Sequence, residues 1–156
     1  MWRNLAQNRL AIEIACECLN TNGFANVRRN KDQGTFPHTY ATATDTRSGV
    51  DYLIGITSRV EVGADGKLNP AYNIVHSAAD RQKAKTLANH MKRTLAFIAI
   101  VLRETNGSYA TFFGELAPPL GFPIEVPMLP PDRLRFGYRQ LSPFTPDARV
   151  KELFAN

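Results

Sequence analysis

Two acidic residues and one basic residue in the first sixty positions have the side chains that metal-dependent catalysis uses. Glu13 lies in a helical pattern, and Asp51 and Arg59 fall in a strand-like segment. Because successive side chains of a strand alternate, Asp51 and Arg59 share one face of that strand. Carboxylates are suitable ligands for Mg²⁺, whereas an arginine replaces a lysine only as a charge, because it stays protonated. We therefore treat Glu13, Asp51 and Arg59 as a candidate catalytic site, with Glu13 and Asp51 as the metal ligands.

A second group of residues is basic and suits a phosphate backbone. The chain has 19 Lys and Arg against 14 Asp and Glu, a net charge of +5. Lysine and arginine neutralise phosphates in nucleic-acid complexes, and they also commonly form a solvated surface. The excess is moderate, so it does not choose between DNA, RNA and an acidic protein partner. The candidate nucleic-acid-binding residues are Arg28, Arg29, Lys31, Lys85 and Lys92.

Length and composition indicate a single globular domain over 1–156. The chain is 44% hydrophobic and 21% charged, which is typical of such a domain. No apolar run approaches the roughly 20 residues of a bilayer span, and residues 1–5 show no secretory pattern. We therefore expect a cytoplasmic protein without a membrane partner. Cys16 and Cys18 are two residues apart, so on a helix their side chains point about 200° apart and can neither bond each other nor share a metal ion.

The elements that must position these residues follow from the hydrophobic pattern. The spacing predicts helices over 4–22 and 77–93, and strands over 24–27, 39–44, 50–59, 95–102 and 109–116. Asn106-Gly107 predicts a tight hairpin before the last strand. Eight of the ten prolines follow residue 117, which predicts an extended arm over 117–156 that ends in a short helix near 147–154. The expected fold class is α/β, a mixed central sheet flanked by helices.

This order of elements resembles the PD-(D/E)XK nuclease superfamily, which has the restriction-endonuclease-like fold. A helix that carries Glu13 leads into Gly23-Phe24 and a first strand, and segment 39–59 is similar to the catalytic hairpin of the family. In that family an Asp on one strand faces a Glu-x-Lys on the next. The acids hold Mg²⁺ at the scissile phosphate, and the lysine positions the attacking water. The resemblance covers residues 5–116.

The chain departs from the family pattern at three of the four catalytic positions. Gly55 and Thr57 occupy the positions of the family's Glu and Lys, and Pro37-His38 stands in place of Pro-Asp, whose Asp falls at 38–40. Glu13 alone matches. Because hard cations are held chiefly by charged oxygens, a site with one carboxylate would bind Mg²⁺ poorly. The resemblance thus implies a nuclease-like fold with a degenerate catalytic signature.

Three functions are compatible with these patterns. The preferred one is a nucleic-acid-associated or assembly protein that keeps the fold and has lost cleavage. The second is an active Mg²⁺-dependent endonuclease whose rearranged site requires Glu13, Asp51 and a basic residue such as Arg59 to converge within about 5 Å. The third is a structural or homo-oligomeric protein without a nucleic-acid role, whose basic groups scatter evenly. Mg²⁺ is implied as a cofactor only for the second.

Overall fold

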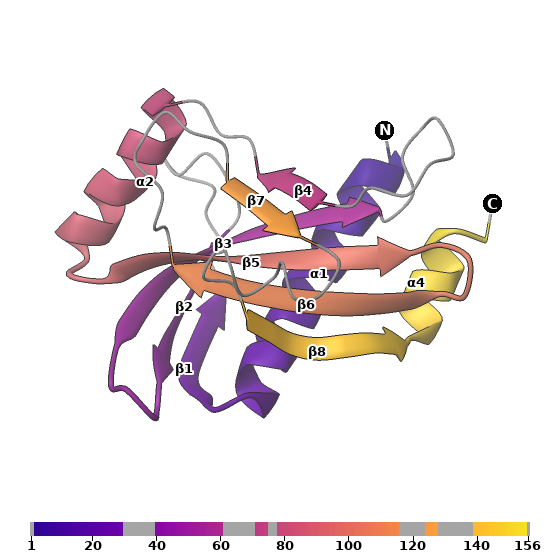
Figure 1. The fold of residues 1–156 in the computed structure, drawn as a ribbon, viewed down its shortest axis with the longest axis horizontal. Coiled ribbons are helices and arrows are strands. Elements are labelled where there is room, and N and C mark those ends of the chain that lie inside the picture. Colours follow the sequence, from indigo (N-terminus) through magenta and orange to yellow (C-terminus); the bar gives the residue numbers. More distant parts are fainter. Residues whose placement is uncertain are drawn as a thin grey trace.

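The computed structural model describes residues 2–29, 40–60, 71–74, 78–115, 124–127 and 139–155 (Figure 1). The helices are α1 (Trp2–Thr21), α2 (Ala78–His90) and α4 (Ala148–Leu153). The strands are β1 (Phe24–Arg29), β2 (Tyr40–Asp45), β3 (Asp51–Val60), β4 (Ala71–Ile74), β5 (Thr94–Arg103), β6 (Ser108–Glu115), β7 (Ile124–Pro127) and β8 (Arg139–Pro146). None of the helices in these ranges is long and apolar enough to cross a membrane.

A six-stranded mixed sheet forms the centre of the fold, in the order β1-β2-β3-β5-β6-β8. β3 and β5 run parallel, and the other neighbouring strands of this sheet are antiparallel. β4 and β7 pair separately as a two-stranded sheet. The main sheet is strongly curled. The curl brings Oδ2 of Asp45 in β2 to 3.7 Å from Nη2 of Arg139 in β8, although three strands lie between β2 and β8 in the sheet.

The helix α1 covers one face of the sheet together with α4 (Figure 1). Ile14, Ala15 and Leu19 are fully buried in the core that α1 forms with residues of β3 and β5 such as Ile54 and Ile98. The apolar residues recur at helical spacing, so a single stripe of α1 enters the core. This face, which we call the α1 face, holds the larger of the two cores.

The helix α2 packs on the opposite face, which we call the α2 face. Its buried Ala84 and Ala88 belong to a core with Leu53 of β3 and Phe97 of β5. Because side chains alternate along a strand, β5 contributes Phe97 to the α2 face and Ile98 to the α1 face. The prediction of a central strand covered on both sides is confirmed.

Two turns have the backbone conformations that their sequences predict. Gly23 ends α1 with φ +84°, and the buried Phe24 follows it into the core. Gly107 closes the β5–β6 hairpin with φ +63°. A side chain would be strained at both positions, because L residues rarely adopt these angles. The mixed α/β class and the order of the main elements are therefore as expected.

The proline-rich arm is the part of the predicted fold that needs correction. Residues 139–146 are not irregular, because they form β8 at the edge of the main sheet. Pro143 and Pro146 fit there, since an edge strand leaves one side of its backbone without a ladder partner. The predicted final helix is confirmed as α4. Most of the stretch from 116 to 138 lies outside the described residues.

Candidate nucleic-acid interface

The structure does not bring Glu13, Asp51 and Arg59 together. Glu13 is an exposed residue of α1, and its Oε2 lies 3.4 Å from Nη1 of Arg149. Asp51 opens β3 on the α2 face, because the next residue, Tyr52, belongs to the core of the α1 face. Arg59 shares the face of Asp51 but lies eight residues along the strand, about 26 Å at the usual rise. The sheet thus separates Glu13 from the other two residues.

Glu13 belongs to a charged cluster that joins α1 to α4. Both carboxylate oxygens of Glu17 accept hydrogen bonds from Arg149 at 2.8 Å, and Asp147 accepts from the same guanidinium at 2.9 and 3.0 Å. These hydrogen bonds lower the pKa of Glu17 and of Asp147, and they raise the pKa of Arg149. Asp147 also caps α4 by accepting from the backbone N–H of Arg149. The cluster therefore has a structural role that accounts for Glu13.

The positions of the family's catalytic hairpin lie on the α2 face. Tyr40 of β2 is the cross-strand partner of Gly55 in β3. Thr57 is half-buried, and its hydroxyl accepts a hydrogen bond from Nη1 of Arg59 at 3.1 Å. His38 lies outside the described residues. Tyr40 and Gly55 lie opposite each other in the β2–β3 hairpin, and neither residue supplies a carboxylate.

Metal-ligating side chains do not gather elsewhere in the described ranges. No three His, Cys, Asp or Glu side chains of those ranges are placed to hold one metal ion. Cys16 and Cys18 are free thiols on α1. Cys18 is buried with its Sγ 3.0 Å from Oγ1 of Thr111, and burial raises the pKa of the thiol. This thiol joins α1 to β6.

The two adjacent arginines of β1 point to opposite faces of the sheet. Arg28 pairs with Thr42, and Thr42 pairs with Leu53 of the α2-face core. Arg29 pairs with Ala41, which belongs to the core of the α1 face. Because cross-strand partners project to the same side, only Arg28 shares a face with α2. Both arginines are exposed.

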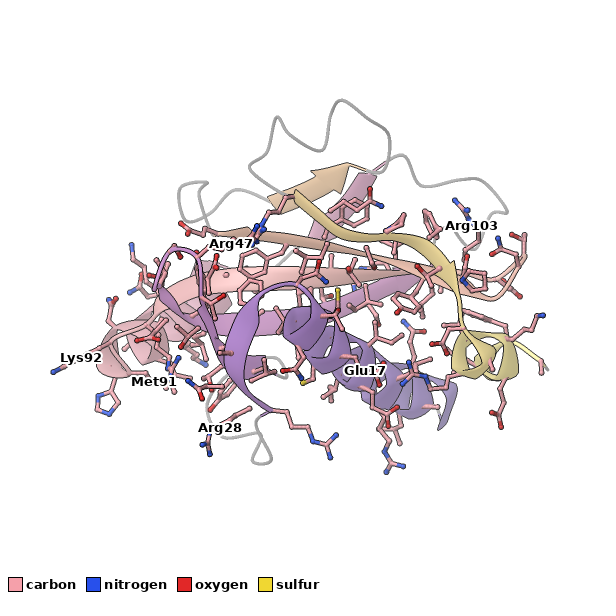
Figure 2. The ribbon with its side chains drawn as sticks, turned by 90° about the horizontal axis from the view of Figure 1, so that it is seen from below. Glu17, Arg28, Arg47, Met91, Lys92 and Arg103 are labelled. Carbon is pink, nitrogen blue, oxygen red and sulfur yellow. The ribbon has the colours of Figure 1, made fainter. Side chains whose placement is uncertain are left out.

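The outer surface of α2 is basic. Lys83, Lys85 and Lys92 are exposed, and the sequence from Gln82 to Arg93 contains no Asp or Glu. Between described residues, the ion pairs are those of Arg47, Arg139 and Arg149, so these lysines are not neutralised there. Lys31 lies outside the described ranges. Figure 2 shows Arg28 and Lys92 projecting outward from β1 and from the end of α2.

A strip of hydroxyl groups lies between Arg28 and α2. Thr42 and Thr44 project to the α2 face and are half-buried. Both belong to β2, the strand that lies between β1 and β3. Asp51 is the acidic residue beside them, and its carboxylate accepts a hydrogen bond from Thr44. We call the set of Arg28, Thr42, Thr44, Lys83, Lys85 and Lys92 the basic surface. Cationic and hydroxyl groups in this arrangement suit a chain of phosphates.

A cavity on the α1 face was not predicted from the sequence. It has a volume of about 450 Å³ and lies where β2, β3, β6 and β8 meet. Its lining includes Asp45, Tyr52, Phe113, Glu115 and Arg139. Those residues come from strands that are distant in the chain, so no local spacing marks them.

The Tyr52 hydroxyl donates a hydrogen bond of 2.6 Å to Oε1 of Glu115. Burial first, and then this hydrogen bond, raise the pKa of Tyr52, so the hydroxyl remains a donor at neutral pH.

No protein-family model, curated protein or solved structure matches this chain. The function is therefore inferred from the residues and their geometry.

Proposed function

We propose that the chain is a nucleic-acid-binding protein of restriction-endonuclease-like fold that has lost the family's cleavage groups. The observation that carries the proposal is the basic surface on the α2 face. Its exposed lysines lie on a helix segment without acids, and Arg28 lies on the same face of the sheet. An arrangement of this kind attracts phosphates without a compensating internal ion pair.

The order of elements supports the fold part of the proposal. The helix α1, which carries Glu13, precedes Gly23 and β1, and β2 and β3 then form a hairpin. After that hairpin, and after β4 of the separate two-stranded sheet, come α2 and a strand, β5, that pairs with β3. This is the sequence of elements that the resemblance implies, and Tyr40 and Gly55 lie opposite each other within it.

The residues at the family's catalytic positions support loss of cleavage. Gly55 offers no side chain, and the Thr57 hydroxyl is neutral and bonded to Arg59. Glu13 lies beyond the sheet and is engaged by Arg149. A rearranged site on Glu13, Asp51 and Arg59 lacks the convergence that it requires, because these residues lie on two faces and at two ends of β3.

The binding experiment measures fluorescence anisotropy of labelled duplex and single-stranded DNA and RNA at about 50 and 200 mM salt. Each neutralised phosphate contributes roughly −0.7 to −0.9 to the slope of log affinity against log salt. We expect the double variant Lys85→Gln/Lys92→Gln to weaken binding at least about tenfold and to lower the slope by about two.

The matched control is Arg9→Gln, which removes an exposed cation from α1 on the opposite face. We expect this variant to bind like the wild-type protein. Equal losses in both variants would indicate diffuse charge attraction and would contradict the assignment to the α2 face. No binding by the wild-type protein would favour a structural or oligomeric role.

Cleavage is tested separately with plasmid, single-stranded DNA and RNA in Mg²⁺ and in Mn²⁺. We expect all three substrates to remain intact. Robust cleavage that disappears in Glu13→Ala would overturn the loss of activity, since Glu13 is the residue that matches the family's helix glutamate.

A further inference from the structure

The cavity at the curled end of the sheet has an aromatic interior. Tyr52 and Phe113 both line it, with ring centroids 5.3 Å apart, and Phe24 packs on Phe113 at 5.2 Å. The guanidinium of Arg139 lies 5.5 Å from the centroid of the Phe113 ring. A volume of about 450 Å³ lies within the range of small-ligand sites, and the rings, which are buried, form the apolar base of the cavity.

Polar groups on the cavity wall are held in place by neighbours. Asp45 is buried, and its Oδ1 accepts from the backbone N–H of Arg47 at 2.9 Å, while Oδ2 lies 3.7 Å from Nη2 of Arg139. The Tyr52 hydroxyl donates its hydrogen bond to Oε1 of the exposed Glu115 and so holds this carboxylate in position. Among the described residues, Oε2 of Glu115 has no hydrogen-bond partner. The wall thus presents a fixed carboxylate with free acceptor capacity and, near it, a fixed cationic donor.

We propose that this cavity binds an unpaired guanine base of a single-stranded nucleic acid. The inference rests on the proposed function and names the base that the bound strand would present. Guanine has two adjacent N–H donors, at N1 and N2, beside the O6 acceptor on its Watson–Crick edge. Glu115 supplies the acceptors for the two donors, since each carboxylate oxygen accepts more than one hydrogen bond. Arg139 supplies a donor for O6.

The other bases match this wall less well. Adenine and cytosine each place one donor next to a ring acceptor, which would face the carboxylate. Thymine and uracil have one donor between two acceptors. A site whose acceptors bind the N–H donors of one base discriminates strongly against other bases, because those bases leave the acceptors of the site without a hydrogen bond. The carboxylate therefore selects guanine by its Watson–Crick edge.

Two arginines near the cavity can contact the phosphates of a nucleic-acid strand bound there. Arg47 is exposed on the β2–β3 turn next to Asp45, and it is visible there in Figure 2. Nη1 of Arg93, which follows α2, donates to the backbone carbonyl of Tyr52 at 3.3 Å. The basic end of α2 and the cavity are therefore neighbours around the end of β3. A strand bound on α2 can continue round this end to the cavity.

The test compares labelled dT oligonucleotides of about 12 nucleotides with and without one central dG, and with deoxyinosine, which lacks the N2 amino group. Fluorescence anisotropy gives the affinity of each. We expect the dG strand to bind at least about tenfold more tightly than the dT strand, and the inosine strand to fall between them. The same series in RNA should give the same order, because the proposed contacts are to the base alone.

The variants separate the cavity from general phosphate binding. Glu115→Gln should reduce the dG preference to within about twofold, because the amide replaces one acceptor by a donor. Tyr52→Phe keeps the ring but frees Glu115, and it should reduce the preference about threefold. Glu104→Gln, an exposed residue at the β5–β6 turn, is the matched control and should keep the preference.

The outcomes distinguish this inference from the proposed function. Equal affinity for the dG and dT strands, or a dG preference that survives Glu115→Gln, overturns the guanine site and leaves nucleic-acid binding intact. Absence of binding to every oligonucleotide removes the proposed function, and the guanine site falls with it. Circular dichroism of Glu115→Gln and Tyr52→Phe confirms that both variants are folded.

Discussion

The two faces of the sheet use their helices differently. On the α1 face, Ile14 and Leu19 are completely buried, and the acids of α1 contact Arg149 from α4. On the α2 face, small residues such as Ala84 and Ala88 contact the sheet, and the exposed lysines have no acidic partner among the described residues. One face is built for stability, and the other keeps its charges available. Variants of the two helices should therefore affect different measurements.

The largest expected effect comes from the core of the α1 face. Ile14→Ala should lower the free energy of unfolding by about 2–5 kcal/mol, because it removes a fully buried side chain and leaves a cavity. Urea unfolding followed by circular dichroism measures the change. Ile12→Ala, at a half-buried position of the same helix, is the matched control and should cost less than half as much. Equal losses would show that packing on this face is not selective.

The Arg149 cluster should contribute less than the core. Arg149→Met should lower the free energy of unfolding by about 1 kcal/mol at neutral pH, because the side chain and its partners are partly exposed and screened. The methionine keeps part of the apolar stem that lies between α1 and α4. Thermal unfolding at low and high salt checks the electrostatic origin, since salt should shrink the difference. A difference that is independent of salt would assign the loss to packing instead.

The same cluster predicts a dependence of stability on acid. Arg149 lowers the pKa of Glu17 and of Asp147 in the folded state. Their contribution is therefore present above the unfolded-state pKa values, near 4, and is lost as the pH falls through the lower folded-state values. We expect the free energy of unfolding to decrease from about pH 5 to pH 2, with a shallower decrease in Arg149→Met. Parallel pH profiles for the two proteins would contradict this assignment.

The smallest expected change in stability is on the α2 face. Lys83→Gln/Lys85→Gln should alter the free energy of unfolding by less than about 0.5 kcal/mol, because both side chains are exposed and have no described ion pair. The same variant should lower the salt slope of nucleic-acid binding. Urea unfolding and anisotropy on one preparation separate the two effects. A large loss of stability would show that these lysines stabilise the fold, and it would contradict the proposed difference between the α1 face and the α2 face.

The main elements were predictable because each leaves a local signal. The apolar run 95–102 matches β5, and Gly23 and Asn106-Gly107 mark turns with positive φ. The strand β8 was not predictable in this way, since Pro143 and Pro146 argue against a strand unless its place at the edge is known.

The candidate site was harder to predict, because it depends on which face each strand presents to a helix. The alternation along β3 correctly grouped Asp51 with Arg59, but it could not tell that α1 covers the other side. The two arginines of β1 were expected to follow a strand that ends at residue 27. The strand continues to Arg29, so alternation separates the pair. The cavity depends on the curl of the sheet, which brings Asp45 to Arg139 and leaves no mark in local spacing.

The contact between Asp45 and Arg139 has a consequence for the order of events during protein synthesis. A ribosome completes β2 long before it reaches β8, and the same is true of α1 and its partner Arg149. Until residues 139–153 have emerged, the buried side of β6 around Thr111 lacks its hydrogen bond to Ser142. From the synthesis of Glu115 until β8 has formed, the nascent chain therefore holds an unpaired sheet edge at β6.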